Sequence, residues 1–445
     1  MISLGLGAIL RQSGYQVQAY KKGPDYIDPM WHRAATGGSC YNLDYFTQSR
    51  AEIKHTFDNH RHSADVVYVE GNKGLFDGVD TFGSDSNAAL AEQLGLPVVL
   101  IVNAQGITRG IAPLLSGYEK FSNSITFAGV ILNEVAGPRH EAKLLAAVKE
   151  YTNLQVLGVV PKLSKLHLEE RHLGLIPQNE AQFSEHYIEQ VSTLVEQHVD
   201  IDRLLNRSAN LALPEMGAPR PESDHSAATV VKIGIARDRA FGFYYPDDLQ
   251  AMQALGAELV YFDTLQDAVL PIVDALFIGG GFPETQLDAL QRNTTMREQI
   301  RAFIKARKPV YAECGGLMYL CNDIRYQGKT ASTVGVIDAS VKMTEKPIGR
   351  GYAKIQAYRS HPWGIGRNIR QQKCCHEFHY SALEGPALDA AMAYEVTRGY
   401  GVNGHTDGIV VNNTLASYCH QRHTENNPWV GEYINFILSL KEKST

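Results

Sequence analysis

The sequence lacks the features that would place it in several specialised classes of protein. Its six cysteines, in 445 residues, show no C-x-x-C spacing, so neither a disulfide framework nor a zinc site is expected. No apolar run approaches the roughly 20 residues that a membrane-spanning helix needs. Residues 2–10 are apolar, but they have neither the basic flank nor the cleavage site of a signal peptide. A net charge of −6 offers no basic surface for nucleic acid. We therefore expect a cytoplasmic protein with no nucleic-acid or membrane partner.

The composition that remains is that of a globular chain, with 44% hydrophobic and 20% charged residues. The length suggests two domains. In the first half, short apolar runs alternate with helical spacing, which predicts parallel βαβ units. The expected strands are residues 66–69, 97–102, 128–132 and 156–160, and an expected helix covers 140–151. After residue 177 the pattern is polar and helical.

Residues 211–229 are rich in proline, alanine, serine and charge, which is typical of a linker. A new α/β series begins at Val231 and runs to the end of the chain. We therefore predict an α/β domain over residues 1–210, a linker over 211–229 and a second α/β domain over 230–445.

The most informative stretch is Tyr311 to Tyr319. A β-favouring run stops at Cys314, and two glycines follow before an apolar helical pattern resumes. This order predicts a strand, a sharp turn and a helix, the setting in which a nucleophile is held on a strained elbow. A thiol at such a helix start would be nucleophilic. A buried core cysteine would also explain Cys314 taken alone.

Two other segments favour a catalytic role for Cys314. A glycine loop that contains Gly280 and Gly281 follows the apolar run 275–278, and glycines there, with Gly315 after the cysteine, let backbone N–H groups approach an oxyanion. His420 ends an apolar stretch that begins near Gly408. The sequence thus orders an oxyanion loop, a nucleophile and a base at the ends of strands.

With "AECGGLMYL" and "SYCH", this half resembles class I-like glutamine amidotransferases, in the branch attached to cobyrinic acid a,c-diamide synthases. The resemblance implies that Cys314 attacks glutamine and that His420 carries the proton. One departure concerns Arg422, which stands two residues after the histidine, where a carboxylate would orient the imidazole. We therefore expect a Cys314–His420 dyad whose orienting group the sequence does not identify.

The first half carries charged loops after its expected strands. Lys21, Asp25 and Asp28 lie in "KKGPDYIDP", where lysine beside carboxylates suits a phosphate held together with a divalent metal. A solvated loop with a surface ion pair is the alternative. The run 66–69 leads into Glu70, at the sheet edge where ligands bind in open α/β folds. Asn133 ends another strand, in a position suited to reading a base edge.

The motifs "KKGPDYIDP", "EGNKGLFDG", "GVILNEV" with "GPRHE", and "EERHLGLIP" resemble, in this order, those of cobyrinic acid a,c-diamide synthases over nearly the whole chain. The resemblance implies a dethiobiotin-synthetase-like P-loop domain that uses ATP and Mg²⁺ to activate a tetrapyrrole carboxylate. Ammonia from glutamine then gives amides at positions c and a. The implied partners are glutamine and a tetrapyrrole dicarboxylate, and a homodimer is compatible with it.

The resemblance also assigns roles to six polar residues of the first half. These are Lys21 for phosphate, Asn133 for adenine, Asp25 and Glu70 for Mg²⁺, and Asp28 and Asp77 for the tetrapyrrole side.

One departure concerns ATP, because the chain contains no G-x-x-x-x-G-K-[ST] motif. We expect the P-loop domain to lack its first strand and its phosphate loop, and ATP affinity to be lost with them. The expected cause is a gene start placed on an internal ATG. An ATP-inactive protein that binds tetrapyrrole is the alternative of another class.

Other departures concern the substrate and a possible metal site. Asn103 stands where the family usually has aspartate, and Asn72-Lys73 is closer to the siroheme-amidating branch. Siroheme and hydrogenobyrinate are therefore alternative substrates. In the run 376–380, histidines flank a glutamate, but on a strand His376 and His379 face opposite sides, so zinc is not expected.

Overall fold

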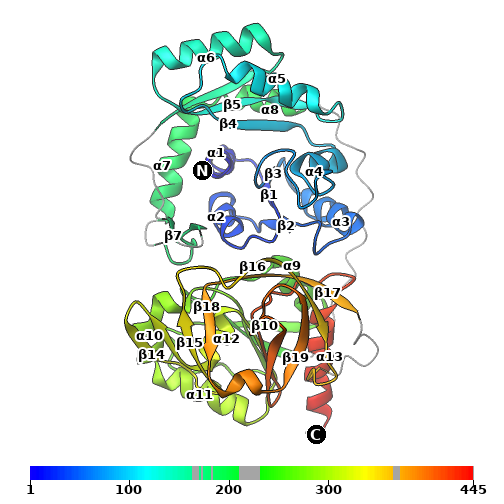
Figure 1. The fold of residues 1–445 in the computed structure, drawn as a ribbon, viewed down its shortest axis with the longest axis vertical. Helices are drawn as coiled ribbons and strands as arrows, with labels where there is room; N and C mark the ends of the chain where they lie inside the picture. Colours follow the sequence, from blue (N-terminus) through cyan, green and yellow to red (C-terminus); the bar gives the residue numbers. More distant parts are fainter. Residues whose placement is uncertain (163–169, 172–173, 182–183, 210–230, 364–370, 444–445) are drawn as a thin grey trace. The chain divides into compact units, whose positions relative to one another are not determined.

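The computed structural model describes residues 1–162, 170–171, 174–181, 184–209, 231–363 and 371–443. It divides the chain into two compact units, one of Met1–Tyr45 with Arg50–Arg220 and the other of Phe46–Ser49 with Pro221–Thr445 (Figure 1). The predicted linker, residues 211–229, lies outside the described residues. None of the described helices is both long and apolar enough to span a membrane.

The first unit contains two three-stranded parallel sheets within its described residues. One has the order β2-β1-β3 and the other β4-β5-β6. The strands are β1 (Val17–Lys22), β2 (Tyr41–Leu43), β3 (Val66–Glu70), β4 (Val98–Asn103), β5 (Phe127–Val135) and β6 (Val156–Pro161). A short pair, β7 (Glu170–Arg171) and β8 (Gly174–Leu175), follows them. The four strands predicted from the apolar runs are confirmed as β3 to β6.

Eight helices accompany these sheets in the described part of the first unit. They are α1 (Ile2–Gln12), α2 (Ile27–Thr36), α3 (Arg50–Arg61), α4 (Asn87–Leu94), α5 (Ile111–Phe121), α6 (Pro138–Tyr151), α7 (Ser184–His198) and α8 (Ile201–Ala209). The helix predicted over residues 140–151 is confirmed as α6. It buries Leu144 and Val148, as its helical spacing requires. The predicted helical region after residue 177 is α7 and α8.

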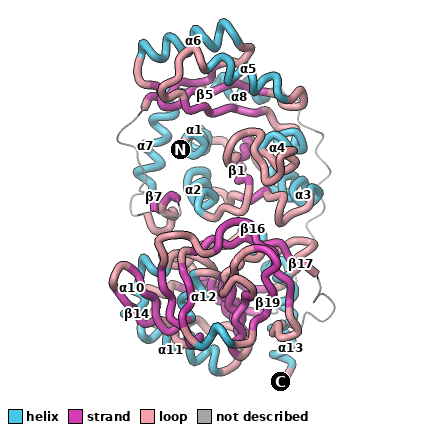
Figure 2. The backbone as a smooth tube through the Cα atoms, in the orientation of Figure 1, coloured by secondary structure: helices cyan, strands magenta, loops and turns pink. Residues whose placement is uncertain are grey.

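Strands β3 and β4 are edge strands of the two sheets in the first unit. Within the described residues, β3 pairs with β1, and β4 pairs with β5. Figure 2 draws the strands in magenta and labels β1 and β5. On β4 the side chain of Ile101 is 45% exposed, although parallel strands are ordinarily covered on both faces.

The described part of the second unit is built on a nine-stranded sheet of order β10-β9-β11-β12-β21-β20-β19-β16-β17. Its first five strands run parallel and the remaining pairs are antiparallel. The strands are β9 (Val231–Ala236), β10 (Ala257–Phe262), β11 (Ala275–Ile278), β12 (Val310–Glu313), β16 (Gly349–Ala357), β17 (Gln372–His379), β19 (Met392–Arg398), β20 (Thr406–Val411) and β21 (Thr414–Ser417). The α/β series predicted from Val231 is therefore confirmed.

A smaller sheet and several helices complete the second unit. The sheet has the order β14-β13-β15-β18, with β13 (Cys321–Tyr326), β14 (Lys329–Ser332), β15 (Ile337–Met343) and β18 (Ser381–Glu384). The helices are α9 (Pro246–Ala254), α10 (Leu287–Arg292), α11 (Thr294–Lys305), α12 (Gly315–Leu320) and α13 (Trp429–Glu442), with short 3-10 turns η1 (Pro283–Gln286) and η2 (Pro386–Asp389).

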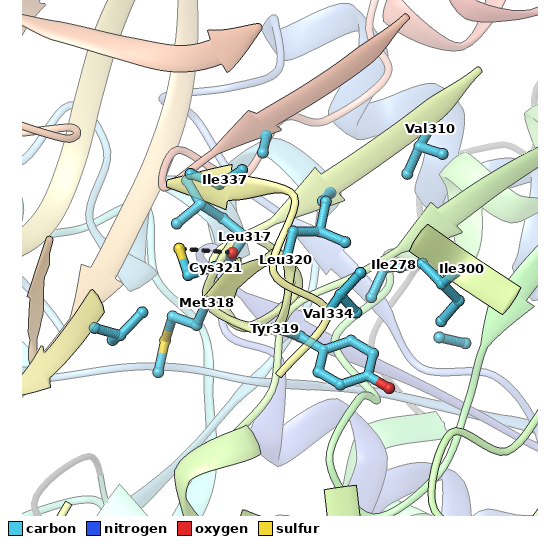
Figure 3. Close-up of a cluster of buried hydrophobic side chains, with 14 of the residues drawn as sticks. Ile278, Ile300, Val310, Leu317, Met318, Tyr319, Leu320, Cys321, Val334 and Ile337 are labelled. Carbon is cyan, nitrogen blue, oxygen red and sulfur yellow. Dashed lines mark hydrogen bonds between the residues drawn. The ribbon is translucent and has the colours of Figure 1, made fainter. Parts of the chain in front are cut away.

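The central parallel strands of the second unit are covered on both faces. Alternation of side chains sends Ile278 and Val310 to one core, and Phe277 and Tyr311 to another. The first core surrounds α12, all six of whose residues are buried (Figure 3). The second is aromatic: Tyr311 lies with its ring centroid 4.9 Å from that of Trp429. Helix α12 is therefore fixed by packing, since a helix of six residues has little stability of its own.

Asp407 on β20 anchors the segment that follows β21. Its buried carboxylate accepts hydrogen bonds from Ser417 Oγ (2.6 Å), Tyr418 N (3.0 Å) and Cys419 N (2.9 Å). Three donors around one buried carboxylate fix the backbone immediately before His420, because each donor would otherwise be unsatisfied away from water.

Asp407→Asn should destabilise the second unit, because the amide NH₂ would face donors where an oxygen now accepts. We expect the free energy of unfolding to fall by about 1–3 kcal/mol, the cost of unsatisfied buried donors. Urea unfolding followed by tryptophan fluorescence measures it, since Trp363 and Trp429 both lie in this unit. Asp288→Asn, which removes an exposed partner of Lys329, is the control and should change little. Equal loss in both variants would contradict the anchoring role.

Candidate active site

Cys314 occupies the sharp turn between β12 and α12, as predicted. Its φ of 46° and ψ of −101° lie in a region that residues other than glycine rarely adopt. Hydrogen bonds hold it on both sides: its N–H donates to Ser417 O (2.7 Å), and its C=O accepts from Met318 N (3.0 Å). The side chain is 6% exposed. The nucleophile elbow expected from the sequence is therefore present as backbone geometry.

The sheet brings His420 to this elbow. Strand β21 runs parallel to β12, with Glu313 opposite Ser417, so the residues just beyond both strands meet at one edge. The backbone of His420 then bridges to that of His376, with His420 N donating to His376 O at 2.7 Å. His420 is buried, and its imidazole interacts with Cys314. The structure thus unites the two residues of the predicted dyad.

The charge state of His420 follows from its neighbours. Burial lowers its pKa, but hydrogen bonds and charge interactions with Cys314 and Glu313 outweigh burial and raise the pKa of His420 to about 10. The imidazole is therefore protonated at neutral pH. Because this pKa is above the unfolded value of 6.5, the stability it contributes is fully present below that pH and is lost as the pH rises through about 10.

The glycine loop lies against both residues. A Cβ added at Gly280 would come within 2.4 Å of His420 Cε1, and one added at Gly315 within 3.0 Å of Gly281 N. Gly281 has a φ of 155° and would place a Cβ 2.0 Å from Ala240 O, so only glycine fits there. These contacts bring the predicted oxyanion residues, Gly280, Gly281 and Gly315, beside the dyad.

Glu313, the residue before the cysteine, is a neighbour of His420 that the sequence reasoning missed. Its Oε2 lies 3.4 Å from His420 Nδ1. Its other oxygen, Oε1, accepts from Tyr311 Oη (2.5 Å) and Gln421 N (2.9 Å). The available signal was the letter E in "AECGG", an acidic residue at the buried end of a strand, which calls for a partner.

Arg422, which stands where the orienting carboxylate was expected, is engaged elsewhere. Its guanidinium pairs with Asp247 Oδ2 at 2.5 Å and lies over the ring of Tyr245 at 5.1 Å. Both partners belong to the start of α9 and the residue before it. Arg422 therefore ties the segment after His420 to α9.

In the first unit, a second charged cluster lies at the carboxyl ends of β1 and β3. Lys21 Nζ pairs with Asp28 Oδ2 (2.5 Å) and Glu70 Oε2 (2.9 Å). Burial opposes protonation of Lys21, but the carboxylates of Glu70 and Asp28 outweigh it and raise its pKa. The lysine is therefore a fixed cation. The structure places Asp28 in the same cluster as Glu70, although the sequence analysis assigned the two residues to different sides of the site.

His32, which the sequence analysis did not identify, also contacts Glu70. Its Nε2 lies 2.8 Å from Glu70 Oε2, and its Nδ1 lies 2.7 Å from Tyr68 Oη. Ser3 donates to the other oxygen of Glu70. Burial raises the pKa of Glu70, but the bond to His32 and the charges of His32 and Lys21 outweigh it and hold the pKa below its usual range. Glu70 is thus a half-buried anion.

The remaining predicted residues of the first unit lie in different settings. Asp25 accepts from Ile27 N (2.8 Å) and Asp28 N (3.3 Å) at the start of α2. Burial and the charge of Asp28 raise the pKa of Asp25 to about 7. Asp77 is exposed and accepts from Gly74 N within its own loop. Asn133 Oδ1 is buried and has no hydrogen-bond partner among the described residues, and Asn103 lies opposite it in register on β4.

No group of three or more histidine, cysteine, aspartate or glutamate side chains is arranged to hold a metal ion in the part of the chain that the structure describes. The expected split of the 376–380 run is confirmed, because Glu377 and His379 are buried on one face of β17 while His376 lies on the other. Glu377 accepts from Tyr400 N and Gly401 N at 2.6 and 2.8 Å, which gives it a structural role.

Comparison with known proteins places both halves in established families. Residues 232–428 match the CobB/CobQ-like glutamine amidotransferase domain, and residues 47–170 match an AAA domain. Among solved structures, a glutamine amidotransferase from Thermotoga maritima is 13% identical, with a TM-score of 0.31, over 48% of this chain and 83% of that chain.

Curated relatives match along most of the chain. The cobyrinate a,c-diamide synthase of Magnetococcus marinus is 44% identical over 94% of this chain and 90% of its own length. That of Archaeoglobus fulgidus is 40% identical over the same shares. The chain therefore belongs to the cobyrinate a,c-diamide synthase family.

Proposed function

We propose that this chain amidates the a and c carboxylates of cobyrinate, using ATP and glutamine, as a carbon–nitrogen ligase. Residues 1–210 would carry the ATP-dependent amidoligase, and residues 230–445 the glutaminase. Family membership supports the reaction, and the observation that carries it in the structure is Cys314 on its strained elbow beside His420.

In the second unit, Cys314 Sγ would attack the glutamine carboxamide carbon. The C–N bond then breaks, leaving a γ-glutamyl thioester, and protonated His420 gives its proton to the leaving ammonia. Backbone N–H groups of the loop at Gly280 and Gly281 and of Gly315 would stabilise the oxyanion. Water, deprotonated by His420, would hydrolyse the thioester to glutamate.

In the first unit, the substrate carboxylate would take the γ-phosphoryl group of ATP, giving an acyl phosphate and ADP. Ammonia then displaces phosphate and leaves the amide. Lys21 would bind phosphate and Asn133 the adenine. Carboxylate oxygens of Asp25 and Glu70 suit Mg²⁺, which proteins commonly hold with one or two carboxylates and phosphate oxygens. When bound, Mg²⁺ supplies charge neutralisation of the phosphates.

Cys314→Ala should abolish glutamine-dependent amidation while amidation with a high concentration of ammonium persists. The reason is that only the glutamine route needs the thiol. Product formation with each nitrogen source, measured by mass spectrometry, tests this. Cys321→Ala, which changes a buried cysteine of the adjacent strand, is the control and should retain both activities. Equal loss with both donors in Cys314→Ala would mean that the residue is structural.

Glu70→Gln and Asp25→Asn should depress amidation with either nitrogen donor, because both would act on the phosphate side. Removing a charge-assisted interaction with the transition state costs about 2.7–4 kcal/mol, or roughly a hundred- to thousandfold in rate. Asp77→Asn should let monoamide accumulate, because Asp77 is proposed to present the second carboxylate. Chromatography with mass detection separates monoamide from diamide. Normal diamide formation by both Glu70→Gln and Asp77→Asn would contradict these assignments.

The tetrapyrrole could also be siroheme or hydrogenobyrinate, and Asn72-Lys73 motivates the siroheme alternative. Lys73 is exposed, with a φ of 52°, in the loop after β3. Its cationic side chain would suit an additional acidic arm on the substrate. The three tetrapyrroles, supplied singly to the same preparation, distinguish these substrates by the amides formed.

An ATP-inactive tetrapyrrole-binding protein is the alternative of another class, motivated by the absence of a G-x-x-x-x-G-K-[ST] motif in these residues. In that alternative the 445 residues would show no measurable ATP turnover, because no phosphate loop among them would supply backbone donors to the β- and γ-phosphates. Phosphate release in the presence of tetrapyrrole and ammonium tests this. ATP-dependent amidation by this chain would overturn the alternative and support the proposed ligase.

A further inference from the structure

The carboxylate beside His420 carries an inference that rests on the proposed glutaminase and deepens it. We infer that Glu313 is the positioning residue of the glutaminase site: it holds the Nδ1–H of His420, so that the proton exchanged at Cys314 and the substrate is the one on Nε2. A carboxylate that orients the imidazole was expected two residues after His420, where the chain has Arg422. Glu313, the residue before Cys314, takes that role instead.

The two oxygens of Glu313 have distinct environments. Oε1 is fixed by Tyr311 Oη and Gln421 N, while Oε2 faces His420 Nδ1 at 3.4 Å. Because hydrogen bonds hold Oε1 in place, the position of Oε2 relative to His420 Nδ1 is also fixed. The separation of 3.4 Å is longer than an ideal hydrogen bond, but such contacts in free enzymes are often long and tighten when substrate binds.

A buried hydrogen-bonded chain supports this arrangement. Gln421 Nε2 donates to Tyr311 Oη (3.0 Å) and to Tyr394 Oη (3.1 Å), and the His361 ring lies 2.8 Å from the same Tyr394 oxygen. Because the Gln421 amide donates to Tyr311, the Tyr311 hydroxyl is free to direct its own hydrogen at Glu313. Tyr311 and Gln421 therefore both donate to Oε1, and Oε2 is left to face His420.

The other titratable groups that interact with His420 do not take this role. Cys314 is the nucleophile. His376 lies with its ring centroid 6.2 Å from that of His420, and burial with the His420 charge lowers its pKa to about 3, so it is neutral at working pH. Arg422 is paired with Asp247. Among the described groups that interact with His420, Glu313 is the anion able to accept from Nδ1–H.

Glu313→Gln tests the inference by changing the tautomer. The two donors at Oε1 select the amide oxygen of the glutamine, so its NH₂ would face His420 Nδ1. That nitrogen would then be an acceptor, and Nε2 would carry the proton, which is the wrong tautomer for a base facing Cys314. We expect kcat for glutamine hydrolysis to fall by about 10²–10⁴-fold, with KM little changed.

The pH dependence of kcat/KM distinguishes a positioning role of Glu313 from a purely structural one, because a structural role would not shift it. The alkaline limb of kcat/KM reports loss of the His420 proton in the free enzyme. Removal of the Glu313 charge should move this limb down by about one pH unit or more. Glu313→Asp, which keeps the charge, should retain part of kcat and leave the limb closer to that of the unchanged protein.

Glu377→Gln is the matched control, because it removes a buried carboxylate that holds two backbone N–H groups of the same unit without contacting His420. It should leave the limb in place. Tyr311→Phe frees Oε1 from one donor but keeps the charge, so kcat should fall by about fivefold. This variant carries the test if Glu313→Gln does not fold.

The outcomes separate the inference from the function on which it rests. Absence of Cys314-dependent glutamine hydrolysis in the unchanged protein would overturn the proposed glutaminase. A working glutaminase in which Glu313→Gln keeps both its kcat and its alkaline limb would overturn the role of Glu313 alone. If Glu313→Gln does not fold, an unchanged kcat in Tyr311→Phe would do the same.

Discussion

The strained backbone of Cys314 is the constraint on which the second unit depends. A positive φ at a residue with a side chain costs of the order of 1–3 kcal/mol. Hydrogen bonds to Ser417 and from Met318, together with the complete burial of α12, stabilise that conformation. The bond to Ser417 also continues the pairing of β21 with β12. The contact that stabilises the strained backbone of Cys314 therefore also helps to place His420 beside it.

Burial of Glu313 imposes a second constraint. An ionised carboxylate inside a protein is costly unless donors surround it. Here the neighbouring strand residue Tyr311, the backbone after His420 and the imidazole itself provide those donors. Cys314, His420 and Glu313 therefore come from two adjacent parallel strands and the residues that follow them. Because Glu313 lies beside His420, the position of Arg422 need not hold a carboxylate, and Arg422 pairs with Asp247 of α9.

The sequence predicted the helices, the strands and the proximity of Cys314 to His420 better than it predicted which side chains contact the site residues. Strands β3 to β6 and helix α6 follow from local apolar periodicity. The glycine loop, Cys314 and His420 each follow an apolar run, which placed all three at the same edge of one sheet. Glu313 and His32 were missed because their roles depend on side-chain directions set by pairing between strands distant in sequence. Asp28 was assigned apart from Glu70 for the same reason: loop order along the chain does not reveal that Lys21 joins them.

The cluster around Glu70 contains a lysine, whereas the cation beside Glu313 is a histidine. In the first unit, Lys21 remains protonated throughout the physiological range, so Glu70 and Asp28 lie in a field whose positive charge is permanent. In the second, the cation is an imidazole that can both give and take a proton. A fixed charge suits the binding of phosphate, whereas a movable proton suits the making and breaking of an amide. His32 also contacts Glu70, but only the first cluster sets a lysine against its carboxylates, and this difference fits the chemistry proposed for each half.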